Sequence, residues 1–293
     1  MSQKPVCAVS EKAWWKVKKV SSSSRGVFNS SEWVKQGAGL LASAKILRRE
    51  LGVTREEIRN FGERRENPSQ DHWDHVYGLP GASFLLLGYS VEMFLKACLA
   101  RVYLNCPEEM LSREFRRFSH KLPDLANEVE FAFCEHDQNK CPGISDMEAL
   151  KLLSGMIISD ARYPLQPNEA RCVDAYIHSW NRRSSTVNND ALFLRLCALA
   201  ERIRAYANAL RGCSQDPTSS KIILLEPDGY LVYRVGGSLK PRITVKLETE
   251  KMSDGTSAIE SLRDFLSESG IYGELLSIWE KATIRYVQAK AAT

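Results

Sequence analysis

The chain has 293 residues, of which 44% are hydrophobic and 26% are charged. These values are typical of a globular protein with one large or two modest domains, and they exclude fibrous and wholly disordered classes. The formal net charge of +4 permits an acidic partner such as RNA, but so small an excess does not itself indicate nucleic-acid binding.

The cysteine pattern and the N-terminal sequence bear on the compartment. The eight cysteines form no CxxC pair, and several lie within apolar helical patterns. The first residues lack the apolar run and the small-residue cleavage site of a secretory signal. We therefore expect a cytoplasmic protein with reduced thiols.

Residues 1–30 are basic and aromatic, with the sequences KAWWKVKKV and SSSSR, and they show no helical or strand period. We expect an N-terminal arm. Its lysines and the adjacent Trp14 and Trp15 suit the phosphates and bases of a nucleic acid. The alternative is that the two indoles dock on the rest of the protein while the lysines stay in water.

Apolar residues at helical spacing predict an amphipathic helix from Ser31 to Leu51. After Gly52, a capping-box pattern at Thr54 and Glu57 predicts a short charged helix to about Arg65. Residues 70–81 are expected to form a polar connection. This connection contains two imidazoles and two carboxylates, from Asp71, His72, Asp74 and His75. Together they could bind a transition metal. The alternative is a polar loop without a metal.

The densest apolar stretch runs from Phe84 to Leu104 and predicts a helix that is buried on most of its circumference. Glu92, Lys96 and Arg101 interrupt it, so we do not expect a membrane span. Glu92 and Lys96 have the favourable i, i+4 order of an ion pair, which matters far more if the pair is desolvated.

Further helices are predicted after this stretch. Pro123 suits the first turn of a helix that starts at Leu122 and runs to about Phe133, and Ser145 with Glu148 forms a second capping box. Together with the central helix, these segments predict an antiparallel helical bundle over residues 31–211. We expect the first of these helices to end at about residue 133 and the second at about residue 159. Two later helices are expected over residues 169–182 and 189–211.

Residues 212–293 differ in character and predict a small accessory α+β unit. Residues 221–249 carry β-forming residues around a Pro-Asp-Gly turn, which indicates three antiparallel strands. Helices at about 256–267 and 272–288 are expected to cover one face of this sheet. The predicted fold class is therefore mainly α, with a C-terminal α+β appendage that is a candidate contact for a protein partner.

Two motifs resemble those of the HEPN superfamily of antiparallel helical bundles. The first is Ser-x-Glu-x-x-x-Lys-Ala, with Ser90, Glu92 and Lys96, and the second is the His-x-Leu-x-x-Leu helix start at His120. The segment Arg162-Tyr163-Pro164 resembles the RYP-type segment before the last bundle helix. The resemblance covers residues 81–211 and implies a symmetric homodimer that acts on RNA in bacterial stress or antiviral defence.

Active members of this superfamily are metal-independent endoribonucleases, without a cofactor, that use an Arg followed after four to six residues by a His. Such a site needs an acid or base for the 2′-hydroxyl and a guanidinium for the phosphate charge. Arg171 with His178, and Arg113 with His120, have this spacing. The first pair lies late in the bundle, as the resemblance requires, and its seven-residue separation puts both residues on one helix face.

The other polar residues of the resemblance form a substrate-binding or structural cluster: Ser90, Glu92, Lys96, His120 and Arg162. His120 can open a helix and contact Glu92 and Ser90 in a purely structural role. The alternative function is accordingly a catalytically inactive dimerisation and protein-interaction module. No phosphate-binding loop, dinucleotide fingerprint, HExxH or GxSxG pattern is present, which argues against nucleotide hydrolases, zinc proteases of that type and serine hydrolases.

Overall fold

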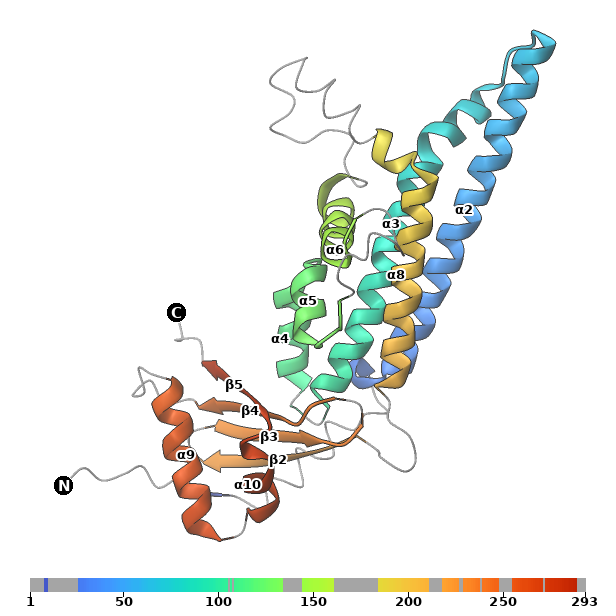
Figure 1. Ribbon diagram of the computed structural model, residues 1–293. Helices are drawn as coiled ribbons and strands as arrows, with labels where there is room; N and C mark the ends of the chain where they lie inside the picture. Colours follow the sequence, from blue (N-terminus) through green and yellow to red (C-terminus); the bar gives the residue numbers. More distant parts are fainter. Residues whose placement is uncertain are drawn as a thin grey trace, which may run out of the picture. The chain divides into compact units, whose positions relative to one another are not determined.

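A computed structural model describes most of the chain, and it is mainly helical with a small sheet near the C-terminus, which confirms the predicted fold class (Figure 1). The predicted helix at 169–182, and with it Arg171 and His178, lies outside the described residues, as does Arg162. The described residues are 8–9, 26–104, 106, 108–133, 144–160, 184–210, 218–226, 229–237, 239–247, 255–270 and 272–288.

The chain divides into two compact units. The helical unit consists of Ser30–Leu99 and Phe115–Asn208. The sheet unit consists of Met1–Asn29, Ala100–Glu114 and Ala209–Thr293.

Three long helices run side by side in the helical unit: α2 (Ser30–Arg64), α3 (Gln70–Val102) and α8 (Asp190–Ala209) (Figure 1). Most of the apolar stretch of α3 is buried, as its apolar density predicts, including Phe84, Val91 and Leu95. Leu41 and Leu51 of α2 and Leu196 and Ile203 of α8 are buried as well. The apolar faces of three helices thus form one core.

Helix α2 is continuous, so the predicted break at Gly52 is wrong. A glycine inside a helix costs roughly 1 kcal/mol relative to alanine. Leu51 and Thr54 on either side of it are 0% and 1% exposed, and burial of this kind outweighs the local cost. The Thr54 hydroxyl donates to the carbonyl of Glu50 at 3.1 Å instead of capping a new helix.

Helix α3 begins at Gln70, so the predicted polar connection over 70–81 is also wrong. Gln70 donates to Asp74 one turn later at 2.8 Å, and Pro80 is accommodated within the helix. Among the described residues, α3 is the one helix that is long and apolar enough to cross a membrane by length and composition. Because 72% of its most apolar window is buried inside the protein, it also fits the core helix of a helical unit.

Shorter helices follow α3. Helix α4 (Glu108–Phe118) was not predicted from the sequence, and its residues Met110, Leu111 and Phe118 are buried. Helix α5 (Leu122–Glu128) has Pro123 in its first turn, as predicted, but ends five residues early. The capping box of Ser145 and Glu148 is present at the start of α6 (Asp146–Gly155), which continues into a π-helical turn, η2 (Met156–Asp160).

The sheet of the second unit has the strand order β1-β2-β3-β4-β5. The three predicted strands are present and antiparallel, namely β2 (Ser219–Glu226), β3 (Gly229–Val235) and β4 (Arg242–Leu247). At one edge, β1 (Ala8–Val9) pairs with β2.

The predicted helix over 272–288 is correct only in its first half. Helix α10 (Gly273–Trp279) ends, and β5 (Thr283–Gln288) then pairs in parallel with β4. The β5 residues Thr-Ile-Arg-Tyr-Val suit a strand. Parallel pairing needs a crossover connection, which α9 (Gly255–Ser269) and α10 provide.

Both faces of the sheet are covered within this unit. Leu262 and Leu266 of α9 and Trp279 of α10 pack against the strands, with α9 lying across the face in Figure 1. On the other face, the Tyr230 hydroxyl meets the sulfur of Met110 at 2.7 Å. Within this unit, Tyr103, Met110 and Leu111 are buried and contribute to the core.

Candidate functional site: two buried carboxylates in the helical unit

The central polar group of the helical unit is Glu92, whose side chain is 2% exposed. The Nζ atom of Lys96 lies 2.6 Å from one carboxylate oxygen, and Nδ1 of His120 lies 2.9 Å from the other. The structure thus brings together Glu92, Lys96 and His120, which we call the Glu92 cluster. Ser90 instead donates to the carbonyl of Gly37 on α2 at 2.8 Å.

Local structure places each member of the Glu92 cluster. Glu92 and Lys96 lie one turn apart on α3, where i, i+4 side chains meet. His120 precedes α5, and its carbonyl accepts from the Ser154 hydroxyl at 2.7 Å. The same hydroxyl accepts from the backbone N–H of Leu122 at 2.9 Å, so Ser154 of α6 fixes the chain at the start of α5.

Aromatic rings surround the charged end of Lys96. Its Nζ atom lies 6.0 Å from the ring centre of Trp33 and 5.8 Å from that of Phe115. The two rings pack edge to face, 5.1 Å apart. This arrangement replaces part of the water that the ammonium group loses, because an aromatic face attracts a cation.

The Glu92 cluster orients one imidazole. Nδ1 of His120 makes the contact with the second carboxylate oxygen of Glu92, which leaves Nε2 outside this contact. The His120 side chain is 29% exposed, whereas Lys96 is 16% exposed. An imidazole that is fixed through one ring nitrogen can contact a ligand through the other, and it can equally serve as a structural support.

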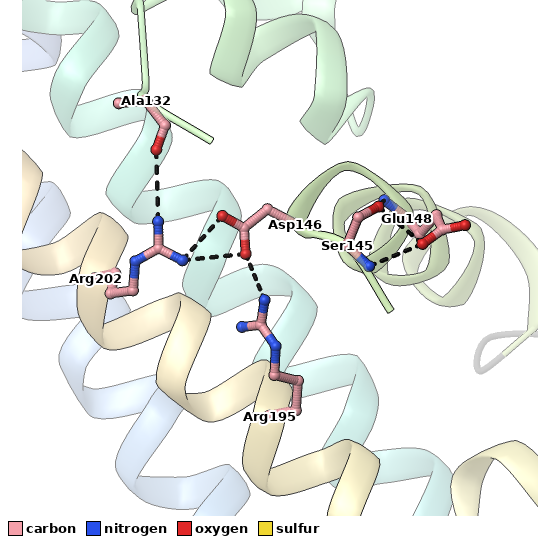
Figure 2. A network of polar contacts seen from close by, with 6 residues as sticks. All are labelled: Ala132, Ser145, Asp146, Glu148, Arg195 and Arg202. Atoms are coloured by element: carbon pink, nitrogen blue, oxygen red, sulfur yellow. Dashed lines mark hydrogen bonds and ion pairs between the residues drawn. The ribbon is translucent and has the colours of Figure 1, made fainter. Parts of the chain in front are cut away.

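A second buried carboxylate belongs to Asp146, which is 0% exposed at the start of α6 (Figure 2). Arg195 donates to it at 2.6 Å, and Arg202 donates to both of its oxygens at 2.9 and 3.1 Å. Arg202 also reaches the carbonyl of Ala132 at 3.5 Å. We call Asp146, Arg195 and Arg202 the Asp146 cluster, and it ties α6 to α8.

The sequence reasoning missed the Asp146 cluster. Asp146 follows the capping residue Ser145, and acidic residues in a first helical turn are common without any partner. The available signal was on α8, where Arg195 and Arg202 are seven residues apart and so share one face of a helix whose other residues are largely apolar. Where such guanidinium groups are desolvated, a buried anion is the expected partner.

The remaining candidates from the sequence are not assembled by the described part of the chain. Asp74 bonds to Gln70, while His72 lies 2.6 Å from the Ser69 hydroxyl and 3.5 Å from Glu57. Within the described ranges, no group of three or more His, Cys, Asp or Glu side chains could hold a metal ion, so the metal alternative at residues 71–75 has no support there. Arg162, Arg171 and His178 lie outside these ranges.

Comparisons with known proteins do not add to this geometry. No model of a known family matches the chain, and neither curated proteins nor solved structures give a match. The relationship to the HEPN superfamily therefore stays a prediction.

Proposed function

We propose that the chain is an RNA-directed protein of the HEPN type, which binds RNA and cleaves it without a metal ion in bacterial stress or antiviral defence. One observation supports this most: the two motifs that carry the resemblance meet at a single buried carboxylate. Glu92 and Lys96 come from the first motif, and His120 comes from the second. A chance occurrence of both motifs would not require them to share an ion pair.

In this proposal, Arg171 and His178 carry the chemistry. In the helix that the sequence predicts over residues 169–182, seven residues span about 10.5 Å along the axis and return to the same face, so both side chains could reach one phosphodiester. His178 would take the proton from the 2′-hydroxyl, whose oxygen would then attack the adjacent phosphorus. The bond from phosphorus to the 5′-oxygen would break, the 5′-oxygen would leave with a proton returned by His178, and a 2′,3′-cyclic phosphate would form. Arg171 would stabilise the charge that develops on the phosphate. The Glu92 cluster would hold the helices that frame this site.

A second candidate function is an inactive dimerisation and protein-interaction module. The saturation of Glu92 favours it, because both carboxylate oxygens are engaged and the side chain is 2% exposed. Such a carboxylate has little capacity left for a substrate. Buried ion pairs of this kind can specify a helical packing arrangement without touching any ligand.

The deciding experiment is incubation of purified protein with end-labelled single-stranded RNA in the presence of a chelator. We expect cleavage by the wild type, and loss of cleavage in Arg171→Ala and His178→Ala with unchanged circular dichroism. Arg116→Ala, which removes an exposed arginine of α4, is the matched control and should cleave normally. Arg113→Ala tests the other pair, and loss of cleavage in that variant alone would reassign the site.

An inactive wild type would direct attention to the second candidate function. In that case, light scattering should show a stable dimer, and the Arg171→Ala and His178→Ala variants should keep it. An inactive monomer would contradict both candidates.

A further inference from the structure

A pocket of about 310 Å³ lies in the helical unit, between α2 and α8. Its volume is at the lower end of the range of roughly 300–1,000 Å³ that small-molecule sites occupy. Neither the Glu92 cluster nor the Asp146 cluster contributes to it. The lining residues are Lys45, Arg48, Arg49, Asp190, Phe193, Leu194 and Cys197.

Arg48 forms the most buried charged part of the pocket, with 9% of its side chain exposed. Its guanidinium carbon lies 5.7 Å from the ring centre of Phe84 and 5.0 Å from that of Phe193. Its Nε atom is 2.6 Å from Asp190, and Nη1 donates to the carbonyl of Val187 at 2.6 Å. Within the described residues, its buried Nη2 atom has no hydrogen-bond acceptor.

The charges around the pocket are unevenly matched. Asp190 contacts Arg48, and it also contacts Arg55 at 3.2 Å, so one carboxylate serves two guanidinium groups. Lys45 pairs with Glu201 at 2.9 Å, but both side chains are more than 40% exposed, and such surface pairs are weak and easily rearranged. Arg49 is exposed. The pocket therefore carries excess positive charge.

The other side of the pocket is apolar. Phe193 and Cys197 are 2% and 6% exposed, and burial raises the pKa of the Cys197 thiol to about 11, so this sulfur is neutral near pH 7. Leu194 is 67% exposed at the same place. A ligand bound beside the charges could therefore make apolar contact with this side chain.

We propose that this pocket binds a small organic anion. The phosphate or carboxylate group of the ligand contacts Lys45 and Arg49, above the buried charge of Arg48. Its apolar part lies against Phe193 and Leu194. This inference does not depend on RNA cleavage, since none of these residues belongs to the proposed catalytic pair.

Isothermal titration calorimetry with the full-length protein tests the proposal, with adenosine 5′-monophosphate and octanoate as probes. Adenosine and inorganic phosphate serve as controls that keep only the apolar part or only the charge. At least one probe should bind about tenfold more tightly than either control, which corresponds to about 1.4 kcal/mol. The preferred probe identifies the ligand as a phosphate or a carboxylate.

Variants locate the binding. Arg49→Ala and Leu194→Ala should each weaken binding of the preferred probe about three- to tenfold, because each removes one part of the contact. Arg59→Ala, on the same helix and outside the pocket lining, is the matched control and should leave the affinity unchanged. Arg48→Ala is avoided, because Arg48 packs between two phenyl rings and its loss affects folding.

Three results would overturn the proposal. The first is that neither probe binds at millimolar concentration. The second is that inorganic phosphate or adenosine binds as tightly as the better probe. The third is that Arg49→Ala and Leu194→Ala bind like Arg59→Ala. Because calorimetry does not require catalysis, an inactive ribonuclease leaves the outcome interpretable.

Discussion

Two ion pairs of nearly equal length allow the effect of burial to be measured in one protein. Glu92 and Lys96 are 2.6 Å apart on α3, with side chains 2% and 16% exposed. Glu32 and Lys35 are 2.7 Å apart on α2, with side chains 62% and 73% exposed. We predict that Glu92→Gln strongly lowers the free energy of unfolding and that Glu32→Gln hardly changes it.

The magnitude follows from the surroundings of each pair. Removing one partner of a buried pair costs about 3–5 kcal/mol, because an uncompensated charge stays inside the protein. Glutamine keeps a hydrogen-bond acceptor, and Lys96 keeps some water and two aromatic neighbours, so we expect about 2–3 kcal/mol for Glu92→Gln. For Glu32→Gln we expect less than about 0.5 kcal/mol, as for other exposed helical pairs.

Urea unfolding at neutral pH, followed by far-ultraviolet circular dichroism, measures both losses. Adding Lys96→Met and Lys35→Met completes two double-mutant cycles, which isolate the pairwise terms. The buried cycle should give a coupling energy of at least about 1 kcal/mol, and the exposed cycle less than about 0.5 kcal/mol. Equal coupling energies would refute the reasoning that burial, and not distance, determines the contribution of the pair.

Three further predictions concern packing, the second carboxylate and alkaline pH. Gly37→Ala should destabilise the protein by about 1–3 kcal/mol, because the new Cβ would lie 2.6 Å from the Phe94 ring. Gly39→Ala, whose new Cβ has nothing within 4 Å, should stabilise the protein by about 0.5–1 kcal/mol. Thermal melts that fail to separate the two variants would contradict this prediction. Asp146→Asn should lower the free energy of unfolding by about 3 kcal/mol, measured by urea unfolding, because two guanidinium groups lose their counter-charge. A loss below about 1 kcal/mol would show that water replaces the carboxylate as their partner. Burial raises the pKa of the Cys106 thiol from 9.0 to about 12. Between these two values the folded state keeps a proton that the unfolded state loses, so the free energy of unfolding should fall as the pH rises through this range. In Cys106→Ala the urea midpoint should fall less steeply over this range, and identical slopes would exclude the thiol as the cause.

Local patterns predicted much of the helical unit, and their failures have a common cause. The apolar density of residues 84–104 and the capping box at Ser145 are local features, and both are present in the structure. Gly52 and Pro80 are helix breakers with penalties of about 1 and 3 kcal/mol, yet both lie inside helices. Burial of the neighbouring apolar residues exceeds these penalties, and single-position signals do not include that gain.

The features that the sequence did not predict depend on contacts between residues far apart in the chain. The second half of the helix predicted over 272–288 is wrong, because these residues form β5 and pair with β4. This partner strand lies about 40 residues earlier in the chain. The Glu92–Lys96 pair was predictable, since four residues separate its members. The Asp146 cluster was not, because 49 and 56 residues separate Asp146 from its two arginines.

The two carboxylate clusters solve the same physical problem. Apolar faces of long helices such as α2, α3 and α8 can slide past one another at modest cost, because ridges and grooves repeat along each helix. A buried carboxylate does not tolerate such a slide, since a misplaced partner leaves an unpaired charge inside the protein. The Glu92 cluster fixes α3 against the start of α5, and the Asp146 cluster fixes α6 against α8.

This role would account for the charged residues in α3, the most apolar of the long helices described. A core of leucines alone would stabilise several packings about equally, whereas the two clusters favour one of them. The proposed cleavage of RNA needs two side chains at a set separation, and so it needs one packing. Loss of the Glu92 cluster would then lower cleavage without removing any group that touches RNA, which distinguishes a framework residue from a catalytic one.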